Sequence, residues 1–136
     1  MSMNINKTLE NLRISYQQSS LEVSDCLENP LDQFQKWLKE AIDSRCDEPN
    51  AFVLSTAINN EPRSRVVLLK GVSPKGLIFY TNYESDKGNE IKFNKKVSMN
   101  FLWLPLQRQV RIEGHAFLVD AEVSDKYFNS RPRGSQ

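Results

Sequence analysis

Residues 51–58 read AFVLSTAI and residues 64–71 read SRVVLLKG, and these two stretches decide the fold. Both are short, apolar and rich in β-branched residues, which is typical of strands that line a core. The polar residues 59–62 between them, Asn-Asn-Glu-Pro, are typical of a turn. The sequence therefore predicts two strands joined by a tight turn.

Three further strands are expected downstream, over 77–82 (LIFYTN), 97–104 (VSMNFLWL) and 109–119 (QVRIEGHAFLV). Turns at 73–76 and at Pro105 help to separate them. Tight turns leave no room for repeated helical crossovers, so the five strands favour an antiparallel meander. Because such sheets close or fold over to protect their edges, we expect a small barrel with flanking helices.

The main helix is predicted immediately before the first strand. Asn29 suits an N-cap and Pro30 suits the first helical position. Apolar residues at helical spacing predict the face that packs on the sheet, and they are Leu31, Phe34, Trp37, Leu38, Ala41 and Ile42. Residues 47–50 are expected to end this element. Shorter helices are expected from Ser85 to about Asn94 and after Ser124.

Two parts of the chain are distinguished by composition. Residues 1–28 are polar, carry a short helical pattern around Leu9 and Leu12, and are interpreted as an N-terminal arm. Residues 29–136 are interpreted as one domain, which is ample length for a core that needs neither metal nor disulfide.

The bulk composition excludes several classes of protein. The net charge of +1 argues against a partner bound by charge alone, such as nucleic acid. No apolar run approaches the ~20 residues of a membrane span, and the N-terminus lacks a signal-peptide core. Cys26 and Cys46 form neither a disulfide framework nor a metal motif, so a reduced cytoplasm is the expected location.

Cationic side chains in apolar strands are the main chemical signal. Arg65 and Lys70 flank the apolar run 66–69, and a phosphate would supply the partner that a charge beside a buried strand needs. The alternative is that both cations lie at strand ends and point into water. Strict alternation puts them on opposite faces, so one shared pocket requires a strand end, a bulge or a second subunit. His115, the single histidine, is interpreted as structural, and no metal or nucleophile motif is found.

Other polar groups suit a phosphorylated ligand, each with an ordinary alternative. Tyr80, Thr81 and Lys87 offer donors at a strand-to-helix junction, or form a plain turn. Gln109 and Arg111 share one strand face, or are surface residues of a barrel. The groups near the end of the sequence are Tyr127, Arg131, Arg133 and Ser135. Their guanidinium and hydroxyl groups match the geometry of a phosphate, or they form a solvated basic tail. Arg13 and Tyr16 repeat this combination of arginine and tyrosine more weakly.

Five stretches together resemble the pyridoxine/pyridoxamine 5'-phosphate oxidases: RVVLLK (65–70), FYTN (79–82), the helix with Lys87, RQVRIEG (108–114) and KYFNSRPRGSQ (126–136). The run SRPR-x-SQ is the most specific of them. Residues 12–21 and 29–38 look like the family's entry arm and first helix. The resemblance implies an FMN-binding antiparallel split β-barrel, incomplete at its C-terminus, that forms a homodimer with FMN at the subunit interface.

The resemblance also implies roles for individual residues. FMN would be held by Arg65, Val66, Val67, Leu68, Leu69, Lys70, Tyr80, Thr81, Lys87 and Gln109. The 5'-phosphate of the substrate would be held by Lys70, Tyr127, Arg131 and Ser135, with Arg13 and Tyr16 covering the site. The implied reaction oxidises pyridoxamine or pyridoxine 5'-phosphate to pyridoxal 5'-phosphate with O2, gives hydrogen peroxide and needs no protein nucleophile.

The chain departs from the family pattern at three places. Asp86 stands where the family often carries an arginine, and Ile14 and Ser15 replace a frequent arginine and glutamate. The sequence also stops at Gln136, before the family's later segment, so we expect a truncated chain. Two other functions stay open: a non-catalytic binder of FMN or pyridoxal phosphate, and another split-barrel flavoprotein such as a flavin reductase.

Overall fold

The computed structural model describes residues 4–13, 21–80 and 95–117. The helices are α1 (Ile5–Asn11) and α2 (Pro30–Asp43), with short 3-10 turns at η1 (Val23–Asp25) and η2 (Leu104–Leu106). The strands are β1 (Ala51–Ile58), β2 (Glu61–Ser73), β3 (Gly76–Phe79), β4 (Lys96–Trp103) and β5 (Arg108–His115). The helices predicted after Ser85 and Ser124 lie outside the described residues.

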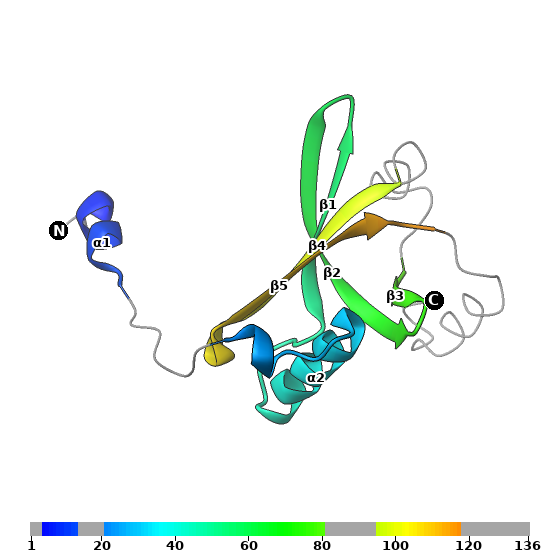
Figure 1. Ribbon diagram of the computed structural model, residues 1–136. Helices are drawn as coiled ribbons and strands as arrows, with labels where there is room; N and C mark the ends of the chain where they lie inside the picture. The colour runs from blue at the N-terminus through cyan, green and yellow to red at the C-terminus, as the bar shows by residue number, and fades with distance from the viewer. Residues whose placement is uncertain (1–3, 14–20, 81–94, 118–136) are drawn as a thin grey trace, which may run out of the picture.

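The five strands form one antiparallel sheet in the order β3-β2-β1-β4-β5 (Figure 1). The five predicted strands are confirmed, and the mainly β half-barrel agrees with the predicted split-barrel class. The simple meander is wrong, because β4 pairs with β1 and not with β3. Strand β1 carries Phe52 and Leu54, which are almost fully buried, and a central strand buries such residues better than the four-residue β3 does.

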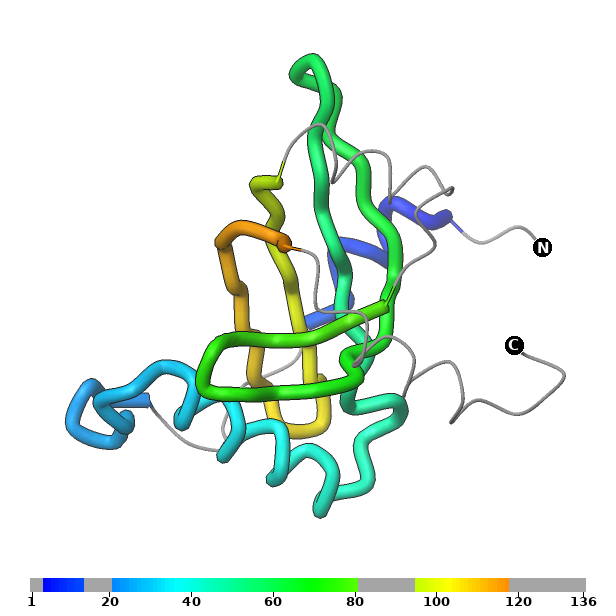
Figure 2. Tube along the Cα trace, turned by 90° about the vertical axis from the view of Figure 1, so that its right-hand side faces the viewer, coloured from blue at the N-terminus to red at the C-terminus, as the bar shows by residue number. Residues whose placement is uncertain are grey.

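The turn between β1 and β2 is tighter than the sequence analysis expected. Only Asn59 and Asn60 form it, with φ of 52° and 65°, while Glu61 and Pro62 already pair with β1. Two consecutive residues with positive φ match the right-handed twist of a hairpin, and asparagine tolerates this conformation. Strand β2 therefore begins three residues earlier than predicted, and the hairpin extends beyond the rest of the sheet (Figures 1 and 2).

Helix α2 packs against one end of the curled sheet, below the hairpin in Figure 1. Its predicted cap is confirmed, because the Asn29 side chain accepts a hydrogen bond from the Leu31 amide at 2.9 Å. Phe34 and Ala41 are buried, but Ile42 is 53% exposed, so its predicted place on the packed face is wrong. Ile42 lies about 80° around the helix from Phe34, at the edge of the apolar stripe. The helix ends at Asp43, before the predicted stop at 47–50.

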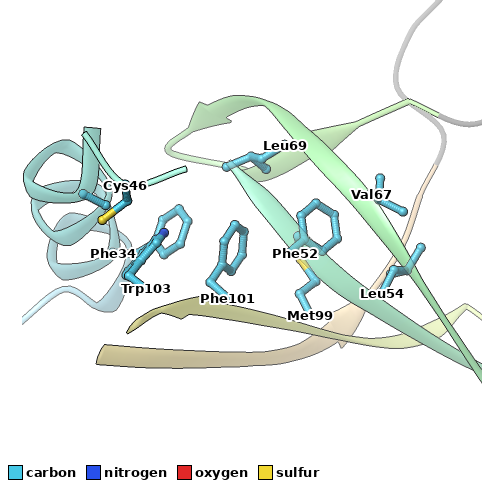
Figure 3. Close-up of a cluster of buried hydrophobic side chains, with 10 residues drawn as sticks. Phe34, Cys46, Phe52, Leu54, Val67, Leu69, Met99, Phe101 and Trp103 are labelled. Carbon is cyan, nitrogen blue, oxygen red and sulfur yellow. The ribbon is translucent and has the colours of Figure 1, made fainter. Parts of the chain in front are cut away.

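The core lies between β1 and β2 on one side and β4 on the other, with α2 closing one end (Figure 3). Aromatic rings dominate it: the centroid of Phe101 lies 4.9 Å from that of Phe34 and 5.1 Å from that of Phe52. Trp103 donates its indole N–H to the Pro49 carbonyl at 2.8 Å, so its one polar atom is satisfied. Helix α1 has no buried residue and stands apart from this core in Figure 1.

Arg108 of β5 contacts two residues of α2, and we expect these contacts to contribute measurably to the free energy of unfolding. Its guanidinium forms an ion pair with Glu40 and lies 4.8 Å from the centre of the Trp37 ring. Because both charged groups are partly exposed, Arg108→Ala should lower the free energy of unfolding by only about 1 kcal/mol. Urea unfolding followed by tryptophan fluorescence measures this difference.

The matched control is Arg111→Ala on the same strand. Arg111 lies 3.7 Å from Glu113, and both side chains are 73% exposed. This substitution should change the free energy of unfolding by less than about 0.5 kcal/mol. Equal losses in the two variants would contradict the role given to Arg108.

Candidate functional site

Arg65 is held on the core-facing side of β2, opposite Leu54 of β1. Its Nη1 donates hydrogen bonds to the Thr56 hydroxyl at 2.9 Å and to the Leu54 carbonyl at 3.2 Å. The side chain is half-buried, so the alternative of an arginine that simply points into water does not hold for this residue. The structure thus presents a cation with a fixed orientation at the edge of the core.

The run 65–70 has two faces, as strand alternation requires. Val67 and Leu69 are buried in the core, with exposures of 7% and 5%. Val66 and Leu68 lie on the opposite side of the sheet and are 67% and 37% exposed. Because the side chains of Val67 and Leu69 are in the core, contacts from these two residues to a ligand would use backbone atoms.

Lys70 lies at an irregularity of the strand. The pairing of β2 with β3 shifts register between Leu69 and Gly71, so Lys70 is the extra residue of a β-bulge. Bulges bend a strand and re-aim the bulged side chain. A bulge was one of three conditions under which Arg65 and Lys70 could serve one pocket, and the structure meets it. Lys70 itself is exposed.

Gln109 lies on the face of the sheet opposite to Arg65. It is exposed, pairs in register with Leu102 of β4, and accepts a hydrogen bond from the Asn100 amide at 3.0 Å. Strands β2 and β5 are separated by β1 and β4, and three strand spacings correspond to about 14 Å. A single copy of the chain therefore does not bring Arg65 and Gln109 together.

Exposed apolar side chains lie on the same side of the sheet as Gln109. We call this side the outer face and define it by Val53, Val66, Leu68, Leu102 and Gln109. Its four apolar members are between 37% and 67% exposed. Contiguous exposed apolar surface marks a place where a ligand or another protein surface binds.

The other predicted site residues are only partly described. Tyr80 follows β3 and is half-buried, and Arg13 is exposed after α1. The remaining predicted residues lie outside the described part of the chain, and they are Tyr16, Thr81, Lys87, Tyr127, Arg131 and Ser135, together with Ile14, Ser15 and Asp86. Their roles stay predictions.

Thr56, the one buried polar side chain among the residues that the structure describes, was not predicted as a site residue. The available signal was a hydroxyl in the inward series Phe52, Leu54, Thr56 of an otherwise apolar strand. His115 ends β5, is exposed and stacks on Phe117, with ring centroids 6.3 Å apart. Within the described ranges, no three histidine, cysteine or acidic residues are grouped for a metal ion, and none of the helices is long and apolar enough to cross a membrane.

The described residues suit FMN in chemistry. The cations Arg65 and Lys70 suit its phosphate, and the Gln109 amide and the apolar outer face suit a flat ring with polar edges. Arg65 and Gln109 lie on opposite faces of the sheet, so within one copy these two residues do not line one pocket.

Solved structures place the fold in the split-barrel class. PhzG from Burkholderia lata 383, crystallised with tetrahydrophenazine-1-carboxylic acid, matches with a TM-score of 0.78 and 28% identity over 83% of this chain and 57% of that chain. A pyridoxamine 5'-phosphate oxidase-related FMN binding protein from Nostoc punctiforme matches with a TM-score of 0.57 and 17% identity, over 75% of this chain and 55% of its own, and supports the fold alone.

Sequence comparison gives the family. The model of the family described as pyridoxamine 5'-phosphate oxidase matches residues 38–136, and the chain belongs to that family. The pyridoxine/pyridoxamine 5'-phosphate oxidase of Paraburkholderia phymatum is 48% identical over 130 residues, and that of Actinobacillus pleuropneumoniae is 44% identical over 128 residues. These matches cover 95% and 94% of this chain and 61% of each relative, so the chain spans about three fifths of the length of these relatives.

Proposed function

We propose that this chain binds FMN and acts in the oxidation of pyridoxamine or pyridoxine 5'-phosphate to pyridoxal 5'-phosphate. The observation that carries the proposal is the 48% identity, over 95% of the chain, to a relative of that name. The structure adds a suitable arrangement, with an oriented arginine at the core edge and an amide on an apolar outer face. When bound, FMN would supply the redox chemistry of the reaction, as the acceptor for the hydride equivalent from C4' of the substrate and the donor of electrons to O2, with hydrogen peroxide as the by-product.

The protein residues bind and orient in this proposal. Arg65 holds the phosphate of the cofactor through charge-assisted hydrogen bonds. The Gln109 amide and the apolar outer face contact the ring and keep water from it. Lys70, with Tyr127, Arg131 and Ser135, holds the 5'-phosphate of the substrate, which fixes the position of C4'. Arg13 and Tyr16 cover the site, and Tyr80, Thr81 and Lys87 complete the cofactor contacts.

We also propose that the chain forms a homodimer through the outer face. Arg65 and Gln109 lie on opposite faces of one sheet, on strands that are three strand spacings, about 14 Å, apart. A two-fold axis places the same apolar surface of both copies in contact. The dimer would cover Val66 and Leu102, which are more than half exposed in the single chain.

Two other functions compete with the oxidase. One is an FMN-binding protein without turnover. An oxidase for a phenazine-type acid is supported by the TM-score of 0.78 to PhzG. The proposed phosphate-binding set Lys70, Tyr127, Arg131 and Ser135 favours a phosphorylated substrate over a phenazine carboxylic acid, which has no phosphate.

Purification of the chain in the presence of FMN tests the function. We expect flavin absorbance to stay with the protein through gel filtration, and peroxide to form when pyridoxamine 5'-phosphate is added in air. Pyridoxamine without its phosphate is the matched control and should give far less peroxide, because the phosphate supplies the orienting contacts.

Each alternative gives a different outcome in the same assay. Bound flavin without peroxide supports the non-catalytic binder. Peroxide with tetrahydrophenazine-1-carboxylic acid, but not with pyridoxamine 5'-phosphate, supports the phenazine-type substrate. Protein that is folded and does not retain flavin contradicts the proposed function.

A further inference from the structure

Thr56 occupies an unusual position on β1. Its side chain is 3% exposed and follows Phe52 and Leu54 on the core-facing side of the strand. A buried hydroxyl group is costly unless it is hydrogen-bonded. Valine has nearly the same volume as threonine and carries no hydroxyl, so it would occupy this position without that cost. The hydroxyl therefore serves something other than packing.

The Thr56 hydroxyl accepts a hydrogen bond from the arginine that we assign to the cofactor phosphate. Arg65 Nη1 donates to Thr56 Oγ1 at 2.9 Å and to the Leu54 carbonyl at 3.2 Å. Leu54 and Arg65 are paired in register, so Thr56 lies diagonally across the strand pair, two residues farther along β1. Two acceptors on one nitrogen fix both the position and the plane of the guanidinium.

An arginine held in this way is prepared for a phosphate before the ligand arrives. A guanidinium recognises phosphate through a planar fork, so its orientation decides whether two parallel hydrogen bonds can form. A flexible arginine loses side-chain entropy when it binds, whereas one held by Thr56 has lost it already on folding. Threonine suits this task because its branched Cβ restricts χ1 and so fixes the direction of the hydroxyl.

We propose that Thr56 is a positioning residue of the cofactor site, whose hydroxyl orients the Arg65 guanidinium toward the phosphate of FMN. The inference rests on the proposed function, since it takes Arg65 as a ligand of that phosphate. Thr56 does not touch the cofactor itself. Its effect is therefore specific to the phosphate and is absent for a flavin that has none.

The test compares FMN with riboflavin, which has the same ring without the phosphate. Dissociation constants are measured by flavin fluorescence quenching for the unaltered chain and for Thr56→Val. We expect Thr56→Val to weaken FMN binding about tenfold, as for one charge-assisted hydrogen bond that is no longer well oriented. Riboflavin binding should change by less than about twofold, because Thr56 acts only through the phosphate ligand.

Matched variants separate positioning from packing. Thr56→Ser keeps the hydroxyl and should restore most of the FMN affinity. Ser55→Ala removes the neighbouring hydroxyl, which contacts Ser64 at 3.2 Å across the same two strands, and should leave both affinities unchanged. In an Arg65→Gln background, Thr56→Val should have no further effect on FMN, since the group that it orients is gone. Thr56→Ala serves as a second hydroxyl-free variant if valine impairs folding.

The outcomes distinguish this inference from the function on which it rests. Equal weakening of FMN and riboflavin by Thr56→Val, or no weakening of either, overturns the positioning role while the flavin function stands. Full FMN affinity in Arg65→Gln overturns both the role of Arg65 and that of Thr56. If the unaltered chain binds neither flavin, the proposed function fails and the inference fails with it.

Discussion

Replacement of Phe101 by alanine is expected to lower the free energy of unfolding by about 3–5 kcal/mol, the largest stability effect among the substitutions considered. Phe101 is 0% exposed and its ring contacts those of Phe34, Phe52 and Trp103. These rings come from α2, β1 and β4, so the cavity would lie where three elements meet. Close packing around the site limits how far the neighbours can relax into the space. Chemical unfolding monitored by circular dichroism measures the loss.

Ile42→Ala is the control for the Phe101 substitution. Ile42 is 53% exposed on α2, outside the packed stripe, and alanine is the best helix former. We expect a change in the free energy of unfolding within about 0.5 kcal/mol. A comparable loss in both variants would mean that the core is not centred on Phe101.

A charge in the outer face should disrupt the proposed dimer. Leu102→Glu places two carboxylates in a self-complementary interface, because a two-fold axis repeats the substituted residue. Leu102 is 55% exposed in the single chain, so the monomer should tolerate the change. Burial of the charges in the interface should weaken dimerisation by several kcal/mol, on the order of a hundredfold or more in the dissociation constant. Analytical ultracentrifugation measures the dimer, and flavin retention should fall with it.

The control is Ile42→Glu, which also replaces an aliphatic side chain by a carboxylate but lies away from the outer face. Ile42 is 53% exposed and Leu102 is 55% exposed. This variant should dimerise and retain flavin like the unaltered chain. Dimerisation that persists in Leu102→Glu would rule out the outer face as the interface. A loss of dimer in both variants would indicate a general effect of added charge.

The strands were predictable because each carries a local signal. Apolar, β-branched runs separated by turn residues fix where β1, β2 and β4 lie to within a few residues. The pairing of β4 with β1 was not predictable, because neighbours in a sheet depend on which strand the core buries most fully. The turn at Asn59 and Asn60 was expected to be longer, because four polar residues in a row do not show which two of them form the turn. The twist of the paired strands favours a two-residue turn with positive φ at both positions.

The candidate site was also predictable only in part. The sequence suggests its residue types, because cations beside apolar strands and the run at 126–136 are local features, and their roles stay predictions. Thr56 was overlooked, since a threonine in a strand is ordinary until its hydroxyl is seen to hold Arg65. The β-bulge at Lys70 likewise depends on the pairing of β2 with β3, which no residue specifies alone.

The sequence by itself determined the approximate positions of the strands and of the main helix, the family, and the hypothesis of a phosphorylated ligand. These follow from short-range patterns: apolar, β-branched runs between turn residues, a helix cap at Asn29 and a set of cationic and hydroxyl side chains. Only the tertiary structure decided the strand order, the burial of Thr56 and the separation of Arg65 from Gln109 on opposite faces. The physical reason is that burial and register arise from packing among distant segments, where the hydrophobic free energy of the whole core outweighs local preference.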